Sequence, residues 1–278
     1  MSQPARYHLR LSAQKGGSIP VNLQDLWEYR ELVGFLAWRE VSSRYRQAAL
    51  GATWAIIQPL LTMAIFSLIF GRLAKVPSDG VPYPIFSFAA LLPWQYCQSA
   101  TVAASKSLVT NTSLITKVYF PRLVIPLSYV LPALLDLAVS LVVFFFMMLF
   151  YGIQPTWRLL CMPAFVLLAF CTAFGVGLWS SALSVQYRDV RHVIPFLTQF
   201  WMFASPVAYS SSLIPESWRS LFALNPMALV IDGFRWSALG IKSPLGMASA
   251  GSTLIALLLL LSGALYFRKM ERDFADVI

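Results

Sequence analysis

Apolar residues dominate this chain in long runs that short polar segments separate. The clearest run follows a basic start at 44–46 and contains no charged side chain from 47 to 71. An α-helix rises about 1.5 Å per residue, so roughly 20 apolar residues cross a hydrocarbon layer of about 30 Å. The run therefore predicts a membrane-spanning helix. Arg44 and Arg46 at its start favour the cytoplasmic side for that end.

The same pattern recurs along the chain and predicts an all-α integral membrane protein with six transmembrane helices in a domain at 50–267. Gly175 and Gly177 in the fourth run are small residues suited to close helix packing. The expected spans cover residues 50–71, 83–105, 123–151, 159–183, 193–209 and 243–267.

Residues 210–244, before the last span, are too polar for one span and too apolar for a free loop. Pro215 begins one short helix, and Asn225, as an N-cap before a proline, begins another. We therefore expect two short re-entrant outer helices. Each carries an acid and a base three residues apart, spaced for a weak local ion pair. The pairs are Glu216 with Arg219 and Asp232 with Arg235.

The segments outside the spans also have distinct patterns. Residues 1–21 are polar and predict a flexible cytoplasmic tail, and 268–278 predict a second one. Residues 22–49 alternate apolar and charged side chains at helical spacing and predict an amphipathic helix on the cytoplasmic membrane surface. The loop at 106–122 predicts a short capped helix, which could dock a partner protein.

The distribution of basic residues indicates the orientation. The segments expected inside hold 15 of the 21 Lys and Arg residues, and those expected outside hold six. The positive-inside rule therefore places both termini on the cytoplasmic side, an N-in/C-in topology.

Composition supports the membrane class and excludes several others. Apolar residues make up 58% of the chain and charged residues only 12%, which is unusual for a soluble domain of 278 residues. The net charge of +9 is scattered between apolar runs, so a membrane surface is a better partner than nucleic acid. The three cysteines lack CxxC spacing or a histidine cluster, so we expect small buried side chains and no metal site.

The chain also lacks the residues of an enzyme. It has no phosphate-binding loop of the G-x-x-x-x-G-K-[ST] type, so we do not expect it to hydrolyse ATP itself. Its two histidines lie in a tail and a loop, and no acid–base pair lies within the spans. Transport or assembly is therefore the favoured class.

Aromatic and polar side chains in the first, second and fifth spans are candidates for a transport path. Trp94, Gln98, Thr101 and Ser105 share one helix face, which can serve helix packing or line a pathway. Aromatic rings could form a wall along which flat sugar faces slide. The candidate channel residues are Trp54, Phe66, Phe70, Trp94, Gln98, Thr101, Phe196, Gln199, Phe200 and Phe203.

Asp136 lies within the third predicted span, where an ionisable group costs about 2.5–3.5 kcal/mol on insertion scales. It should therefore be paired, protonated or near water. A hydrogen bond between spans is favoured over a proton relay, because no charged residue is near it in sequence.

Five segments together resemble the membrane subunit of ABC-2 type exporters. Within that superfamily they are most similar to permeases that move lipid-linked polysaccharides such as O-antigen, capsule or teichoic acid. The resemblance runs from residue 23 to 240 with the segments in the same order. The segments are RYRQAALGATWAIIQPLLTMAIFSLIFG at 44–71, VPYPIFSFAALLPWQY at 81–96, KVYFPRLVIPLS at 117–128, QYRDVRHVIPFLTQFWMFASPVAY at 186–209 and LNPMALVIDGFRWSALG at 224–240.

The resemblance implies a multi-pass protein of the bacterial inner membrane. It would form a homodimer with two copies of a separate ATP-binding subunit, which would hold ATP and Mg²⁺, while this chain would bind no cofactor. Its substrate would be a polysaccharide on an undecaprenyl carrier, as in O-antigen export during lipopolysaccharide biosynthesis. A small-molecule or drug exporter of the same superfamily is the alternative, and a membrane glycan enzyme or scaffold is the other rival.

The resemblance also implies roles for cytoplasmic residues. The cytoplasmic entrance would hold Tyr119, Phe120 and Arg122, and Arg122 could meet the pyrophosphate of the carrier. A further set would transmit the motion of the ATP-binding subunits to the spans. These coupling residues are Asp25, Glu28, Thr112, Leu114, Ile115, Lys117, Tyr187, Arg188 and Asp189.

Overall fold

The regular structure of the described residues is helical throughout. The computed structural model describes residues 23–46, 53–118, 120–241, 247–271 and 274. The predicted tail at 1–21 lies outside these residues. The described helices are α1 (Leu23–Glu28), α2 (Arg30–Arg46), α3 (Trp54–Phe66), the π-helix η2 (Ser67–Leu73), α4 (Tyr83–Thr110), α5 (Thr112–Lys117), α6 (Val124–Phe150), the 3₁₀-helix η3 (Trp157–Cys161), α7 (Met162–Gln186), α8 (Val190–Phe203), the 3₁₀-helix η4 (Ser211–Leu213), α9 (Glu216–Phe222), α10 (Pro226–Leu239) and α11 (Met247–Glu271).

Four of the described helices are long and apolar enough to cross a membrane. They are the continuous α3 and η2 at Trp54–Leu73, α6, the continuous η3 and α7 at Trp157–Gln186, and α11 over Ser249–Glu271. The expectation of an all-helical membrane protein is therefore confirmed. The second and fifth predicted spans correspond to α4, which has 28 residues, and to α8, which has only 14. The count of six spans stays a prediction.

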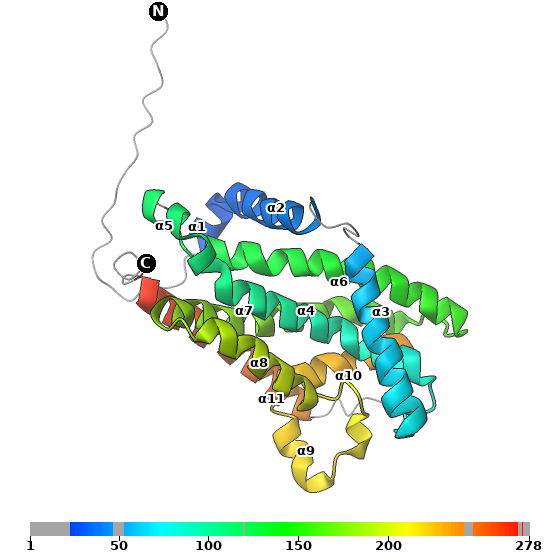
Figure 1. Cartoon of the computed structure of the whole chain (residues 1–278). Coiled ribbons are helices and arrows are strands. Elements are labelled where there is room, and N and C mark those ends of the chain that lie inside the picture. The colour runs from blue at the N-terminus through cyan, green and yellow to red at the C-terminus, as the bar shows by residue number, and fades with distance from the viewer. Residues whose placement is uncertain (1–22, 47–52, 119, 242–246, 272–273, 275–278) are drawn as a thin grey trace, which may run out of the picture.

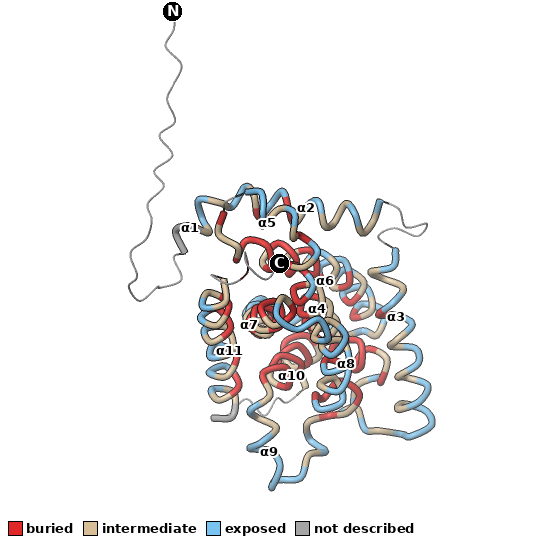
Figure 2. Tube along the Cα trace, turned by 60° about the vertical axis from the view of Figure 1, so that its left-hand side comes forward, coloured by how far each residue is buried: buried red, intermediate tan, exposed pale blue. Residues whose placement is uncertain are grey.

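Helix α4 forms the centre of the bundle. It packs most extensively against α7 and α6, and α10, α3 and α8 also contact it. Figure 2 shows α11 and α3 at opposite sides of the bundle, with α4, α7 and α10 between them. Only 11% of the apolar span in α3 is buried inside this subunit, so most of its surface faces away from the bundle.

Within the helix predicted at 22–49, the described residues 23–46 form two helices, and their place on the membrane surface stays a prediction. Tyr29 separates α1 from α2, and α2 packs against α6. Figure 2 shows α1, α2 and α5 along one edge of the molecule and α9 at the opposite edge. Val33 and Leu36 are buried under α2, whereas Phe35 and Trp38 remain exposed at 67% each. The helix therefore has one buried and one open face, as its sequence pattern predicts.

Close packing of α7 on α11 depends on glycines. A Cβ atom added at Gly175 would lie 2.6 Å from the backbone nitrogen of Leu260, and one at Gly263 would lie 2.5 Å from the carbonyl oxygen of Gly175. Both distances are shorter than a normal contact to a carbon atom, and both neighbours are backbone. The expectation that Gly175 permits close helix packing is confirmed.

We expect Gly175→Ala to lower the free energy of unfolding by about 1–2 kcal/mol, because α11 must move away from α7. Gly34→Ala is the matched control, since a Cβ atom at Gly34 in α2 meets nothing within 4 Å. Chemical denaturation of both variants in detergent micelles measures the difference. Equal stability of the two variants would contradict a steric role for Gly175.

The two predicted outer helices correspond to α9 and α10. Asn225 caps α10 through its side-chain oxygen, which accepts from the backbone N–H of Met227 at 3.1 Å. The Glu216–Arg219 pair is present at 3.2 Å on the surface. The expected local contact between Asp232 and Arg235 is corrected, because burial directs Arg235 elsewhere. Its guanidinium is 2% exposed and donates to the carbonyl oxygens of Phe86, Pro206, Val207 and Tyr209.

Candidate functional site

The structure divides the predicted channel residues by exposure. Five are exposed on the single subunit: Trp54, Phe196, Gln199, Phe200 and Phe203. Three are partly buried: Phe66, Phe70 and Gln98. Two are buried, Trp94 and Thr101. Their common role in a channel stays a prediction.

The exposed aromatic side chains form a face on α8. Phe196, Phe200 and Phe203 are each between 58% and 59% exposed, and the rings of Phe196 and Phe200 have centroids 4.5 Å apart. Their spacing of four and three residues places them on one side of the helix. No other described element covers this side.

The two buried members take part in packing inside the subunit. The ring of Trp94 meets the ring of Trp201 edge to face, with centroids 5.7 Å apart. The Thr101 hydroxyl lies 3.5 Å from the carbonyl oxygen of Ala173 in α7. At these two positions, the polar stripe of α4 therefore serves contacts between helices.

A cavity of about 470 Å³ lies between α2, α3, α4 and α6. It contains two of the predicted channel residues, Trp54 and Gln98, together with Arg44 and Asp136. The polar or aromatic side chains that line it are Arg44, Tyr45, Trp54, Gln58, Gln95, Tyr96, Gln98, Ser99, Asp136 and Ser140.

Asp136 is paired, as its position in a span requires. Nη1 of Arg44 lies 2.9 Å from a carboxylate oxygen of Asp136, and the hydroxyl of Tyr45 donates to the other oxygen. Burial and the hydrogen bond to Asp136 raise the pKa of Tyr45 to about 12, so the phenol remains a donor at neutral pH. The pair links the end of α2 to the middle of α6.

Tyr96 also lines the cavity, but its hydroxyl oxygen is itself buried and has no hydrogen-bond partner among the described residues. The side-chain amides of Gln58, Gln95 and Gln98 give the cavity both donors and acceptors. Such a set suits a polar, hydroxylated or phosphorylated ligand.

The predicted cytoplasmic entrance is described only in part. Tyr119 lies outside the described residues, and Phe120 is buried at 5% exposure. The guanidinium of Arg122 donates to the carbonyl oxygen of Glu271, and its backbone N–H donates to the Glu271 carboxylate at 3.1 Å. Arg122 therefore joins the start of α6 to the end of α11.

We expect Arg122→Ala to lower the free energy of unfolding by about 1–2 kcal/mol, because a charged hydrogen bond between α6 and α11 is lost. Arg122→Lys retains the positive charge and one donor, so it should lose less. Chemical denaturation measures how much the contact between Arg122 and Glu271 contributes to stability. Export of the glycan, measured at matched protein levels, tests whether Arg122 also binds the substrate. Unchanged export in both variants would contradict the prediction that Arg122 binds the pyrophosphate of the lipid carrier.

The predicted coupling residues lie at one end of the bundle or on its surface helices. Figure 1 places the turn between α7 and α8 at the same end as α5 and the end of α11. Asp25 lies in α1, and Ile115 is the buried residue of α5. The exposed members of the set are Glu28, Lys117, Tyr187, Arg188 and Asp189, whereas Thr112 and Leu114 are partly buried.

Sequence reasoning missed several residues of the cavity. Arg44 is separated from Asp136 by 92 positions, and its place before a span indicated only orientation. Tyr45, Gln58 and Gln95 were not predicted either. One feature of the sequence pointed to this cavity: the carboxylate of Asp136 lies within a predicted span and needs a partner. The sequence did not indicate which residue that partner is.

Comparisons with known proteins agree with this architecture. The family model for the ABC-2 type transporter matches residues 31–239. The O-antigen export system permease protein RfbA of Myxococcus xanthus is 30% identical over 259 residues, which cover 92% of this chain and 98% of the relative. A protein of the same name from Klebsiella pneumoniae is 26% identical over 250 residues, covering 89% of this chain and 95% of the relative. The polysialic acid transport protein KpsM of Escherichia coli is 23% identical over 202 residues, covering 70% of this chain and 76% of the relative.

The family match covers more than half of the chain, and it includes every helix from α2 to α10. Four apolar helices of spanning length accompany it. The chain is therefore a multi-pass protein of the bacterial inner membrane and belongs to the ABC-2 type transporter family.

Proposed function

We propose that this chain is the membrane-channel subunit of an ATP-driven exporter that moves a polysaccharide of the O-antigen type across the inner membrane. The observation that carries the proposal is its similarity, over 92% of its length, to a relative named as an O-antigen export permease. The relative named for polysialic acid transport supports the same substrate class. ATP and Mg²⁺ would bind to a separate subunit.

The proposed assembly is a homodimer of six-span subunits with two ATP-binding subunits. The open surface of α3 and the aromatic face of α8 support it, since both helices pack on α4 and leave large apolar side chains exposed on the single subunit. Two such surfaces facing one another would enclose a path lined by aromatic rings. Rings of this kind offer contact area to sugars at a low cost in conformational entropy.

Cysteine cross-linking tests the dimer. In a variant whose native cysteines are replaced, we expect Phe200→Cys to yield a disulfide-linked dimer on oxidation, because the α8 faces approach one another across the path. Leu258→Cys is the matched control, since this residue is 53% exposed on α11, at the other side of the bundle. Equal yields of dimer at both positions would argue against a specific α8 interface.

The cavity at Arg44 is a candidate site for the polar end of the substrate. We infer that the substrate is carried on undecaprenyl pyrophosphate, whose oxygens can accept from the side-chain amides of Gln58, Gln95 and Gln98. The exposed residues of α1, α5 and the turn at 187–189 would contact the ATP-binding subunits. Motion of α2 would then reach α6 through Arg44 and Asp136.

Depletion of the protein in its own cell tests the function. Glycan is followed by surface labelling, and lipid-linked glycan is followed by extraction from the membrane. If surface glycan is lost and lipid-linked glycan accumulates inside, the proposal is supported. If surface glycan is unchanged, polysaccharide export is refuted and the small-molecule exporter becomes the explanation to test.

A further inference from the structure

A second cavity, about 850 Å³ in volume, lies beside α9 and α10. Figure 2 places α9 at the end of the molecule opposite α2. The walls of this cavity come from η4, α9, α10, the start of α11 and Asp79 in the connection between η2 and α4. Its volume is in the usual range for sites that bind small molecules. None of the predicted channel or coupling residues lies in it.

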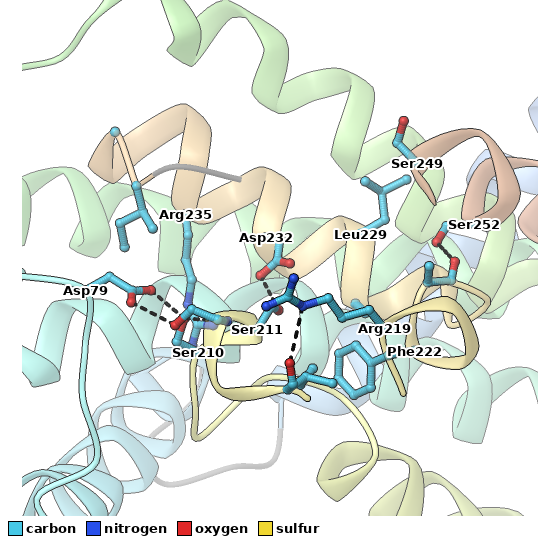
Figure 3. A pocket seen from close by; sticks show the side chains of 16 residues that line it. Asp79, Ser210, Ser211, Arg219, Phe222, Leu229, Asp232, Arg235, Ser249 and Ser252 are labelled. Carbon is cyan, nitrogen blue, oxygen red and sulfur yellow. Dashed lines mark hydrogen bonds between the residues drawn. The ribbon is translucent and has the colours of Figure 1, made fainter. Parts of the chain in front are cut away.

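Two carboxylates are held in place inside this cavity by serine hydroxyls. Asp232 accepts from Ser211 at 2.9 Å, and Asp79 accepts from Ser210 and from Ser212, the latter at 3.1 Å (Figure 3). A carboxylate has about four acceptor positions, so both retain capacity for further donors. The serine oxygens can accept as well. The cavity therefore presents fixed acceptors to any ligand that carries hydroxyl groups.

The formal charges of the cavity cancel. Arg219 and Arg235 are its two cations, and Asp79 and Asp232 are its two anions. Arg235 is occupied by backbone carbonyls, so Arg219 is the more available donor; Figure 3 shows its guanidinium pointing into the cavity. The ring of Phe222 adds an apolar surface. A neutral molecule with many hydroxyls matches this set better than a free ion or an acyl chain.

We propose that this outer cavity is a saccharide-binding site that holds a segment of the exported glycan as it leaves the membrane. The proposal rests on the proposed function, because it takes the exported polysaccharide as its ligand. The carboxylates accept from sugar hydroxyls, Arg219 donates to them, and Phe222 packs against a sugar ring. The serines fix the direction of both carboxylates.

Binding is measured by calorimetry on the complex with its ATP-binding subunits in lipid nanodiscs. The probe is polysaccharide released by mild acid from the surface lipopolysaccharide of the producing cell, and dextran of similar length is the non-cognate probe. We expect Asp79→Asn and Asp232→Asn to weaken binding by about tenfold each, because charged acceptors are lost. Asparagine also tolerates the φ of 54° at Asp79.

Two further variants separate binding from folding. Ser212→Trp places a large ring in the cavity from an exposed position, so it should abolish binding while the complex still assembles and hydrolyses ATP. Glu31→Gln is the matched control, because Glu31 is an exposed carboxylate on α2 and does not line the cavity. Its affinity should stay within twofold of the native value.

Absence of glycan binding to the native complex overturns the site, as does unchanged affinity in both Asp232→Asn and Ser212→Trp. A phospholipid that native mass spectrometry finds retained in the cavity, with glycan excluded, also overturns it. If depletion abolishes surface glycan but the native complex binds no glycan, the proposed export function stands and only the saccharide-binding site is refuted. If surface glycan is unchanged on depletion, both the export function and the saccharide-binding site are refuted.

Discussion

Replacing Arg235 with methionine is expected to lower the free energy of unfolding by about 3–5 kcal/mol, the largest effect of any substitution considered for this chain. The guanidinium donates to four carbonyl oxygens from two separate segments, and its carbon Cζ lies 3.5 Å from the ring centroid of Phe86. Methionine fills a similar volume but donates nothing. It would therefore leave buried carbonyl groups without hydrogen bonds.

Two variants sharpen the measurement. Arg235→Lys keeps the charge but presents a single ammonium, so it should recover only part of the loss, because one point cannot reach carbonyls on both sides. Arg219→Met is the matched control on the same outer face, since Arg219 is 55% exposed and its ion pair is a surface one. We expect it to cost less than about 1 kcal/mol. Similar losses for Arg235→Met and Arg219→Met in chemical denaturation would contradict the structural role of Arg235.

Local pattern predicted the elements well where the cause was local. The N-cap at Asn225, the small residue at Gly175 and the Glu216–Arg219 pair all follow from neighbours a few positions away. The short helix predicted within 106–122 is present as α5, but its expected side-chain cap is not, because the side chain of Asn111 bonds Arg39 and Tyr129 instead. Apolar runs of sufficient length likewise predicted the four helices that can cross a membrane. Each of these features depends on helical geometry alone.

The errors and omissions have a different cause. Arg235 is three residues from Asp232, which suggested a surface pair, but the guanidinium points into the packed interior, toward residues up to 149 positions away. In the same way, one face of α4 was expected either to pack or to line a path. The structure shows packing at two of its positions and a cavity at a third, and the path stays a prediction. Trp94 and Thr101 pack inside, while Gln98 opens into the cavity. Periodicity identifies a face, but only the neighbouring helices determine what that face meets.

The residues that line the cavity at Arg44 could not be predicted from local sequence pattern either. A single carboxylate in a span required a partner, and both Arg44 and Tyr45 supply it from α2. In the amphipathic pattern of α2, these two residues are only the basic and aromatic residues before a span. Their meeting with Asp136 depends on how α2 lies across α6, which no local rule determines.

Removal of the Arg44 side chain is therefore expected to affect both stability and transport. Arg44→Met leaves the Asp136 carboxylate in the span with one hydroxyl donor, so we expect a loss of about 2–3 kcal/mol in the free energy of unfolding. The Arg44 and Asp136 side chains are 33% and 26% exposed, which limits the loss below that of a fully buried pair. Glu40→Gln is the control, because its carboxylate is 4.0 Å from Arg44 and contributes little.

A double-mutant cycle separates the pair from its surroundings. Asp136→Leu combined with Arg44→Met removes both charges, so the double variant should be more stable than the sum of the single losses predicts, with a coupling of about 1–3 kcal/mol. Export and ATP hydrolysis then test transmission. If the pair carries motion from α2 to α6, the double variant regains stability without regaining export, because the two helices are packed but no longer joined. Recovery of export together with stability would show that the pair only neutralises a charge in the membrane, and additive losses in the cycle would show that Arg44 and Asp136 act independently.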